Sequence, residues 1–248
     1  MPFYNAPRSD FKRQLFLQRA AQTAAEDLLA GNLYLSANTI DALENTGLQF
    51  TNTYHQLAIL LTARMTEVDG GEVELQQLQE CLRDLWQVLR RRVRRQNQPV
   101  SVLGLYQLPG DGSQPKSGSR DAWIAMADAA IEGDGLAVAA GYPPVVNPDI
   151  LELQTMLQAL KNRVIAIANA DRAFDLAQAA VAELRPTVDL LIRSVIRELR
   201  ASLVALDEPS YRRIARSYGA EYIYSPGEPP EEDPIPEAAP IEEEPVGS

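Results

Sequence analysis

Histidine and cysteine most often carry acid–base, nucleophilic or metal chemistry in proteins, and this chain has one of each, His55 and Cys81. A catalytic triad or a zinc site needs several such groups together. The Glu-x-x-His motif of di-iron helical bundles is also absent from the sequence. We therefore expect a packed or surface histidine and a half-buried structural thiol, with no catalytic residue, cofactor or bound metal.

Carboxylates offer the main alternative chemistry. Asp69, Glu72, Glu74 and Glu80 could hold a magnesium ion if a second helix supplied facing acids. Asp171 occupies an apolar position of a predicted helix, where an unpaired charge is costly, so we expect it to pair with an arginine or to mark a hydrated gap. An all-α enzyme that uses carboxylates and a divalent metal is thus an alternative hypothesis.

Residues 110–117 have the spacing of a phosphate-binding loop, but Pro115 stands where its second glycine belongs. Proline removes a backbone N–H donor that such a loop needs to surround phosphate. Gly133 and Gly135 lie within a helical pattern, where they weaken or kink a helix. Neither segment predicts a phosphate site.

Arginines form the clearest charged feature, near the end of a predicted helix that closes at residue 95. They are Arg83, Arg90, Arg91, Arg92, Arg94 and Arg95. Positive charge is favourable at a helix C-terminus, which accounts for part of the pattern. We expect this cluster to receive acidic segments, from the chain's own tail, a neighbouring subunit's tail or another protein. A solvated face is the alternative.

A second cluster near the C-terminal end combines the residue types that protein interfaces favour. Its members are Tyr211, Arg212, Arg213, Tyr218, Tyr222 and Tyr224. The segment 220–224 has an extended pattern and could add as a strand to another edge, such as residues 99–108. We expect an interface here, with covering of a bundle end as the alternative.

Composition indicates a helical protein. Of 248 residues 46% are hydrophobic and only 6% aromatic, with a net charge of −11. Eight acids and no base lie between Glu228 and Glu244, so the rest of the chain carries about −3, which disfavours nucleic acid as a ligand. No secretory signal or membrane span is visible, and a single cysteine suits a reducing compartment. We expect a cytoplasmic protein.

Apolar spacing and caps predict the elements. Helices are expected from Ser9 to Gly31, from about 39 to a break at Asp69–Gly71, from 72 to 95, from 120 to 140, from 148 to 184, from 187 to 206 and from 209 to 218. Pro186 should kink or end its helix, and residues 99–108 should be extended.

An internal repeat is the main organisational signal. Residues 20–63 match residues 130–173 at an offset of 110, with Gly31 on Gly141 and Leu43 on Leu153. Farther along, the pairs Leu85/Leu191 and Arg94/Arg200 suggest that the offset drifts to 106. A single irregular helical domain is the alternative to this duplication.

The sequence thus predicts an all-α fold of two tandem, up-and-down helical units with long antiparallel helices. Their predicted bounds are 1–108 and 120–225, with a linker at 109–119 and a disordered acidic tail at 226–248. The predicted function is that of a non-enzymatic structural or interaction protein, an assembly subunit or an adaptor, that uses its arginine and tyrosine clusters for protein contacts or self-assembly. Besides the metal enzyme, the other alternative is a regulator that binds nucleic acid or acidic partners through Arg90–Arg95.

Overall fold

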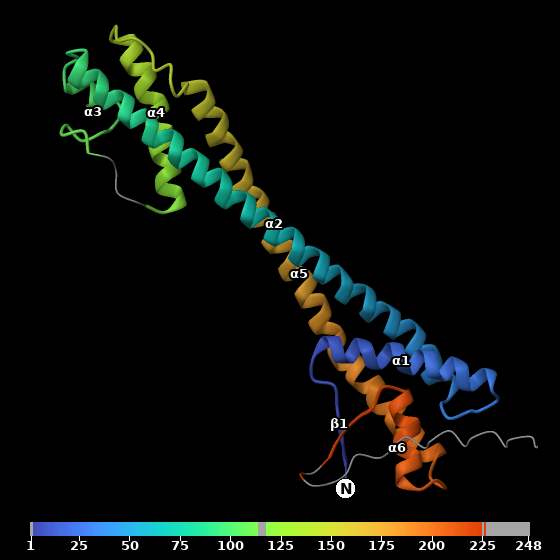
Figure 1. Ribbon diagram of the computed structural model, residues 1–248. Coiled ribbons are helices and arrows are strands. Elements are labelled where there is room, and N and C mark those ends of the chain that lie inside the picture. Colours follow the sequence, from blue (N-terminus) through green and yellow to red (C-terminus); the bar gives the residue numbers. More distant parts are fainter. Residues whose placement is uncertain (1, 114–117, 225, 227–248) are drawn as a thin grey trace, which may run out of the picture. The chain divides into compact units, whose positions relative to one another are not determined.

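The computed structural model describes residues 2–113, 118–224 and 226, and these are mostly helical, which confirms the all-α class (Figure 1). The predicted tail, apart from Pro226, and residues 114–117 of the predicted linker lie outside the described residues. Helices in the described part are α1 (Asp10–Leu29), α2 (Ala37–Arg95), α3 (Ser101–Leu105), α4 (Arg120–Ala139), α5 (Ile150–Ser202) and α6 (Glu208–Ser217). Two short strands, β1 (Phe3–Asn5) and β2 (Glu221–Ile223), accompany them.

The chain forms two compact units. Unit 1 comprises Met1–His55 and Ala180–Ser248, and unit 2 comprises Gln56–Ala179. Each unit therefore contains one part of α2 and one part of α5. These units do not coincide with the sequential units predicted at 1–108 and 120–225, because two long helices continue past the points where a sequential bundle would close.

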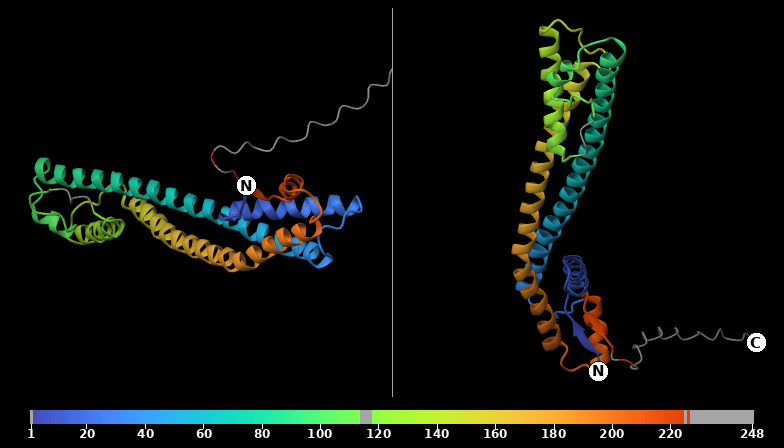
Figure 2. Two further views of the ribbon diagram at one scale, coloured as in Figure 1. Left: turned by 90° about the horizontal axis from the view of Figure 1, so that it is seen from below. Right: turned by 90° about the vertical axis from the view of Figure 1, so that its left-hand side faces the viewer.

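Unit 2 contains α3, α4, the second part of α2 and the first part of α5 (Figure 2). Its core gathers apolar side chains from all four: Leu78, Leu82, Leu85, Trp86, Leu89, Val102, Leu103, Trp123, Ala127, Leu153, Leu157 and Leu160. The Trp86 and Trp123 rings lie 5.9 Å apart between centroids. The apolar stripe of α2 thus buries one face of the helix, and its polar face is left at the surface.

The predicted helix break at Asp69–Gly71 is wrong, since α2 runs unbroken from Ala37 to Arg95. A Cβ atom on Gly71 would lie 2.9 Å from Ile167 Cδ1, and one on Gly70 would lie 3.2 Å from Arg163 Cζ. The two glycines therefore let side chains of α5 approach α2 closely, and tertiary packing outweighs their low helix propensity.

Pro186 does not end its helix either, because it lies inside α5. The flanking residues Val181 and Val188 are fully buried in unit 1. Packing on both sides of the proline holds the helix together despite the missing N–H.

The segment 99–108 is not extended as predicted. It forms the short helix α3, and Val102, Leu103 and Tyr106 are buried. A Cβ atom on Gly133 of α4 would lie 2.6 Å from the carbonyl oxygen of Leu105. Gly133 therefore allows the end of α3 to lie against α4, and α4 continues through the Gly133–Gly135 segment.

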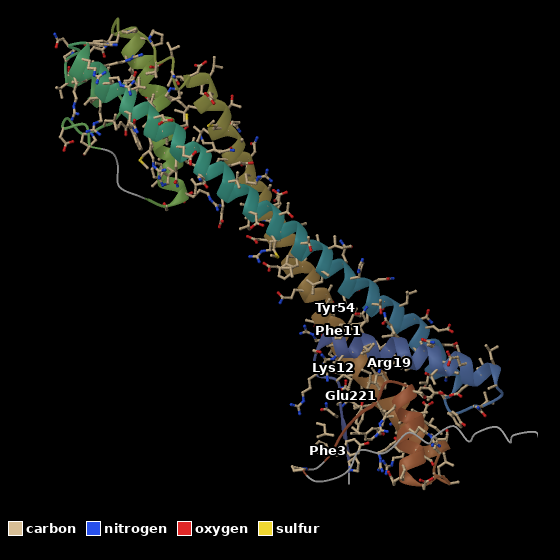
Figure 3. All side chains as sticks on the ribbon, in the orientation of Figure 1. Phe3, Phe11, Lys12, Arg19, Tyr54 and Glu221 are labelled. Atoms are coloured by element: carbon tan, nitrogen blue, oxygen red, sulfur yellow. The ribbon has the colours of Figure 1, made fainter. Side chains whose placement is uncertain are left out.

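Unit 1 contains α1, α6, the first part of α2 and the last part of α5. In this unit β2 pairs antiparallel with β1, with Tyr4 opposite Tyr222, rather than with residues 99–108. Lys12 of α1 forms an ion pair of 2.6 Å with Glu221 of β2, and Figure 3 shows both side chains at the N-terminal end of α1. Arg185 pairs with Asp10 at 2.7 Å, which ties α5 to the first turn of α1.

No helix in the described ranges is both long enough and apolar enough to cross a lipid bilayer.

Candidate interaction site

The last turns of α2 carry an arginine-lined hollow of about 270 Å³ in unit 2, which we call the α2 hollow. Its lining residues are Gln87, Arg90, Arg91, Arg94 and Arg95. The apolar stripe of α2 fixes its position. Leu85, Trp86 and Leu89 are buried, so the side chains off this stripe, including those that line the hollow, turn outward. Four arginines of the cluster predicted from the sequence therefore line the same hollow.

Within the described ranges, no carboxylate lies within 4.0 Å of the guanidinium nitrogens of Arg90, Arg91, Arg94 or Arg95. Asp111 is an acid near the site. Its pKa is lowered, first by the hydrogen bond from the backbone N–H of Ser113 (2.8 Å), then by the Ser113 side chain, and less by Arg90. The stem of Arg90 lies close to Gly112, where a Cβ atom would be 3.1 Å from its Cγ.

Two predicted members of the cluster do not line the hollow. Arg92 donates hydrogen bonds of 2.6 Å to the carbonyl oxygens of Pro143 and Pro144, in the loop between α4 and α5. Arg83 lies over the Trp123 ring, 5.8 Å from its centroid. These two arginines support the fold of unit 2, so the interaction hypothesis is left with the other four.

A second hollow, of about 480 Å³, lies on α5 in unit 1 and is lined by Tyr4, Arg193, Ile196, Arg197, Arg200 and Ala201. Here the arginines have partners. Arg200 pairs with Glu208 at 2.7 Å and lies over the Tyr211 ring. Arg193 donates to the carbonyl oxygen of Asp189, and Arg197 donates to Ser194 Oγ. Of the three arginines in this hollow, one, Arg200, has an acid partner within the described residues, and the other two bind neutral oxygen atoms.

The Tyr4 hydroxyl, at this second hollow, is buried and has no hydrogen-bond partner in the described structure. Burial raises the pKa of Tyr4 to about 12, and the neighbouring Tyr211, Asp189 and Glu221 add to the effect. The hydroxyl therefore stays neutral across the physiological range.

Much of the predicted tyrosine cluster lies inside unit 1. Tyr211, Tyr218 and Arg212 are buried, with only 4%, 1% and 6% of their surfaces exposed. The Tyr218 hydroxyl donates to Asp27 at 2.6 Å, and burial, followed by that hydrogen bond, raises its pKa.

The remaining members lie nearer the surface of unit 1. Tyr222 and Tyr224 are half-buried, and Arg216 lies over both rings. Arg213 is the cluster member with an exposed side chain. The cluster thus covers the end of unit 1, and in this conformation little of it is free to meet a partner.

The carboxylates of the metal hypothesis form ion pairs. Arg163 binds Glu74 at 2.8 Å and also binds Glu67, and these contacts raise the pKa of Arg163. Asp171 pairs with Arg64, as the sequence predicted, although 44% of its side chain is exposed rather than buried. Among the residues that the structure describes, no three or more His, Cys, Asp or Glu side chains are grouped so that they could hold a metal ion.

The two residue types with the broadest chemistry are placed apart from any such group. His55 is exposed on α2. Cys81 is buried, and burial, helped by Glu152 and Asp84, raises the pKa of its thiol to about 11. A thiol that stays protonated at neutral pH is a poor nucleophile, which agrees with a structural role.

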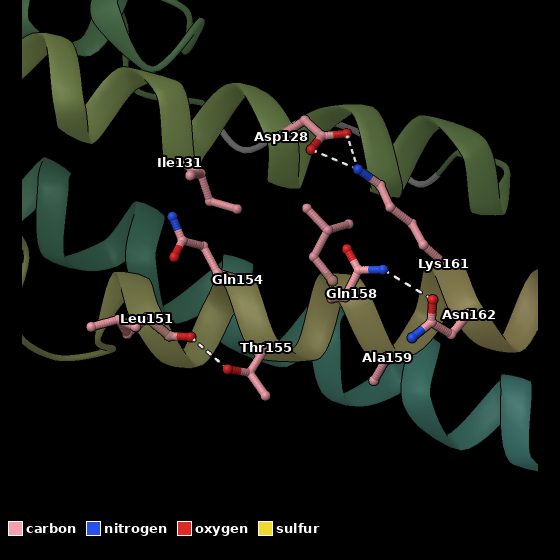
Figure 4. Close-up of a pocket in the computed structure, with 10 residues that line it drawn as sticks. Asp128, Ile131, Leu151, Gln154, Thr155, Gln158, Ala159, Lys161 and Asn162 are labelled. Carbon is pink, nitrogen blue, oxygen red and sulfur yellow. Dashed lines mark hydrogen bonds and ion pairs between the residues drawn. The ribbon is translucent and has the colours of Figure 1, made fainter.

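A third hollow, of about 700 Å³, lies between α4 and α5 in unit 2 (Figure 4). Lys161 Nζ donates to both carboxylate oxygens of Asp128, at 2.8 and 2.9 Å. Gln158 likewise donates to Asn162. These polar groups satisfy one another, so the hollow offers weaker recognition than the α2 hollow does. Sequence reasoning missed the Asp128–Lys161 pair because residues 33 positions apart carry no local signal of contact.

Comparison with known proteins adds no identification: no protein-family model, no curated protein and no solved structure matches this chain.

Proposed function

We propose that this chain is a non-enzymatic helical interaction protein that binds acidic protein segments through the α2 hollow. One observation carries the proposal: four arginines line one hollow, and no carboxylate of the described residues forms an ion pair with them. Arginine forms bidentate hydrogen bonds with carboxylates, which gives such a surface both affinity and geometric selectivity.

The electrostatics of α2 favour a ligand there. Arg90/Arg94 and Arg91/Arg95 are like-charged pairs four residues apart, and each such pair costs a helix about 0.2–0.5 kcal/mol. The helix C-terminus returns about 0.3–1 kcal/mol per cation. Other arginines of this chain, such as Arg163 and Arg185, are already paired with acids. The α2 hollow, in contrast, offers an added anion four arginines that have no acid partner among the described residues.

An internal duplication is the second part of the proposal, and helix ends support it. Ser9 and Ser119, 110 residues apart, each cap a 20-residue helix by accepting a backbone N–H bond of 3.3 Å. Gly31 and Gly141, also 110 apart, close these helices with φ of 81° and 87°. The left-handed conformation favours glycine at both positions.

Burial on the long helices supports the same spacing. Leu82, Leu85 and Leu89 of α2 are buried, and so are the residues 110 positions later. Those are Ile192, Val195 and Leu199 of α5. If the offset were 106, exposed Thr187 would align with buried Cys81. Along α2 and α5, the burial pattern therefore favours an offset of 110 over the drift predicted from the sequence.

The ends of α3 and α6 extend the correspondence at an offset of 112. Tyr106 donates its hydroxyl to Asp134 of α4, and Tyr218 donates its hydroxyl to Asp27 of α1. The next residues, Gln107 and Gly219, both have positive φ. Each compact unit would then combine the first helices of one repeat with the last helices of the other, as in a domain-swapped dimer joined into one chain.

A labelled peptide rich in glutamate, titrated onto the full chain at low and at high salt, tests the binding proposal. We expect saturable binding that weakens with salt and that falls at least about tenfold in Arg91→Glu, which puts a repulsive charge in the hollow. Arg172→Glu is the matched control, because exposed Arg172 is in the same unit and its reversal changes net charge equally. Equal loss in both variants, or no binding by the parent chain, would refute the proposal.

A further inference from the structure

We propose that the natural occupant of the α2 hollow is the acidic C-terminal segment, residues 227–248, of a second copy of this chain. The inference rests on the proposed function, because it names the partner of the same site. It adds that copies associate, each presenting its own acidic segment to the arginines of another.

Charge complementarity is the first argument. The segment from Glu228 to Glu244 holds eight acids and no base, so most of the chain's net charge of −11 is concentrated there. The α2 hollow presents four arginines without a described carboxylate partner. The same chain therefore carries a dense group of acids and, among its described residues, four clustered arginines without an acid partner.

The spacing of the charges is the second argument. The acids include two runs of three consecutive residues, Glu231–Asp233 and Glu242–Glu244. An extended run of three spans about 7 Å between its first and third Cα atoms. Arg91 and Arg95 are separated by about 6 Å along the axis of α2. The first and third acids of an extended run point to the same side, so these two carboxylates match the spacing of arginines one helical turn apart.

The number of runs argues for association between copies. A single run of three acids already offsets most of the charge of four arginines, and adding the second run would overcompensate it. The described part of each chain has one such unneutralised hollow and its tail has two runs. The second hollow, in unit 1, has three arginines, and one of them, Arg200, is already paired with Glu208, so it presents less unneutralised charge than the α2 hollow does. Each chain has one α2 hollow among its described residues, so the two runs of one tail can each occupy such a hollow only if a second copy supplies one of them.

Sedimentation of four full-length or nearly full-length chains provides the test. They are the full chain, a chain ending at Pro226, the hollow variant Arg91→Glu/Arg94→Glu, and a charge swap. The swap adds Glu242→Lys, Glu243→Lys and Glu244→Lys to the hollow variant. We expect the full chain to self-associate at low salt and to dissociate at high salt. Truncation and hollow reversal should each weaken association at least about tenfold, and the swap should restore it.

Rescue by the swap would establish contact between these two charged segments, because the reversed tail can restore association only by meeting the reversed hollow. Arg172→Glu controls for a single charge reversal outside the hollow and should associate as the parent chain does. A full chain that stays monomeric at low salt would overturn the inference, as would association that survives both truncation and hollow reversal.

A peptide of residues 227–248, titrated onto the chain ending at Pro226, separates the two proposals. Binding of this peptide to the parent hollow but not to the Arg91→Glu/Arg94→Glu hollow is the expected result. If a generic glutamate-rich peptide binds and this one does not, the inference fails and the proposed function stands. If neither peptide binds, both fail.

Discussion

Arg92 Nη2 lies 2.6 Å from the carbonyl oxygen of Pro144, and this contact separates Arg92 from the arginines beside it in the sequence. Six arginines crowd the end of α2, yet one of them holds the α4–α5 loop while its neighbours Arg91 and Arg94 line a hollow. The position 110 residues later repeats the contact, since Ser202 Oγ donates to the carbonyl oxygen of Tyr34. Adjacent residues of one type thus have different structural roles.

This separation predicts different effects of truncating neighbouring arginines. Arg92→Ala should lower the free energy of unfolding by about 1 kcal/mol, because the Pro143 and Pro144 carbonyls lose their donors. Arg91→Ala should leave stability within about 0.5 kcal/mol, as surface changes usually do, and weaken acidic-peptide binding instead. Urea titrations and peptide titrations of both variants measure the two effects, and a reversed pattern would contradict the assignment.

Gly133 and Gly135 provide a matched pair for the packing of α3 on α4. Gly133→Ala would place a Cβ atom 2.6 Å from the Leu105 carbonyl oxygen, so we expect destabilisation of about 1–3 kcal/mol. Gly135→Ala meets no atom within 4 Å and should stabilise the helix by up to about 1 kcal/mol. Urea denaturation of the two variants gives both values. Similar destabilisation by both would mean that helix conformation, not the contact with α3, requires Gly133.

Alkaline pH should destabilise the protein. Burial raises the pKa of Tyr4 to about 12 and also raises those of Tyr106, Tyr218 and Tyr222 above the ordinary 10.0. A group that binds its proton more tightly when folded contributes stability that is complete below its unfolded pKa and is lost as pH rises toward the folded one. The free energy of unfolding should therefore fall between about pH 10 and pH 12.

Cys81 adds an earlier step, because its pKa rises from 9.0 to about 11 on folding. Stability measured by urea titration from pH 8 to pH 12 should thus begin to fall near pH 9, and Cys81→Ala should remove that first decline while leaving the tyrosine step. A flat profile up to pH 12 would show that these groups are not buried as the structure places them.

Cutting the chain between its two halves tests how the compact units are built. Unit 1 takes elements from both sides of residues 114–117, and so does unit 2. A protease site inserted there should give two fragments that stay together in gel filtration and separate only in denaturant. Fragments that separate on cleavage would indicate two sequential bundles instead. The uncut protein with the same insertion is the control.

Reordering the halves tests the duplication itself. β1 pairs with β2, so the two ends of the described chain lie beside one another, with Phe3 opposite Ile223. A circular permutant that joins the ends and opens within residues 114–117 should melt within a few degrees of the parent, since the opening interrupts no described helix. Opening at Gly70 instead interrupts α2 and should lower the melting temperature markedly. Equal melting of the two permutants would argue against the proposed arrangement.

Much of the candidate site could be predicted from sequence, because it depends on local periodicity. The apolar spacing of Leu82, Leu85 and Leu89 predicts which face of α2 is buried, and hence that Arg91 and Arg94 point outward. Periodicity did not decide between the two interpretations of the tyrosine cluster, an interface or the covering of a bundle end. Tyr211 and Tyr218 are buried in unit 1, which agrees with the second.

The sequence by itself determined the helical class, the cap at Ser9, the glycine ends at Gly31 and Gly141, and the position of the arginines, since these follow from residues within a few turns of one another. Only the tertiary structure decided that α2 continues through Gly70 and Gly71 and that residues 101–105 are helical. Only the tertiary structure likewise decided that each unit draws on both halves of the chain. Those outcomes depend on contacts between distant residues, such as Gly71 with Ile167 and Gly133 with Leu105, which no local pattern encodes.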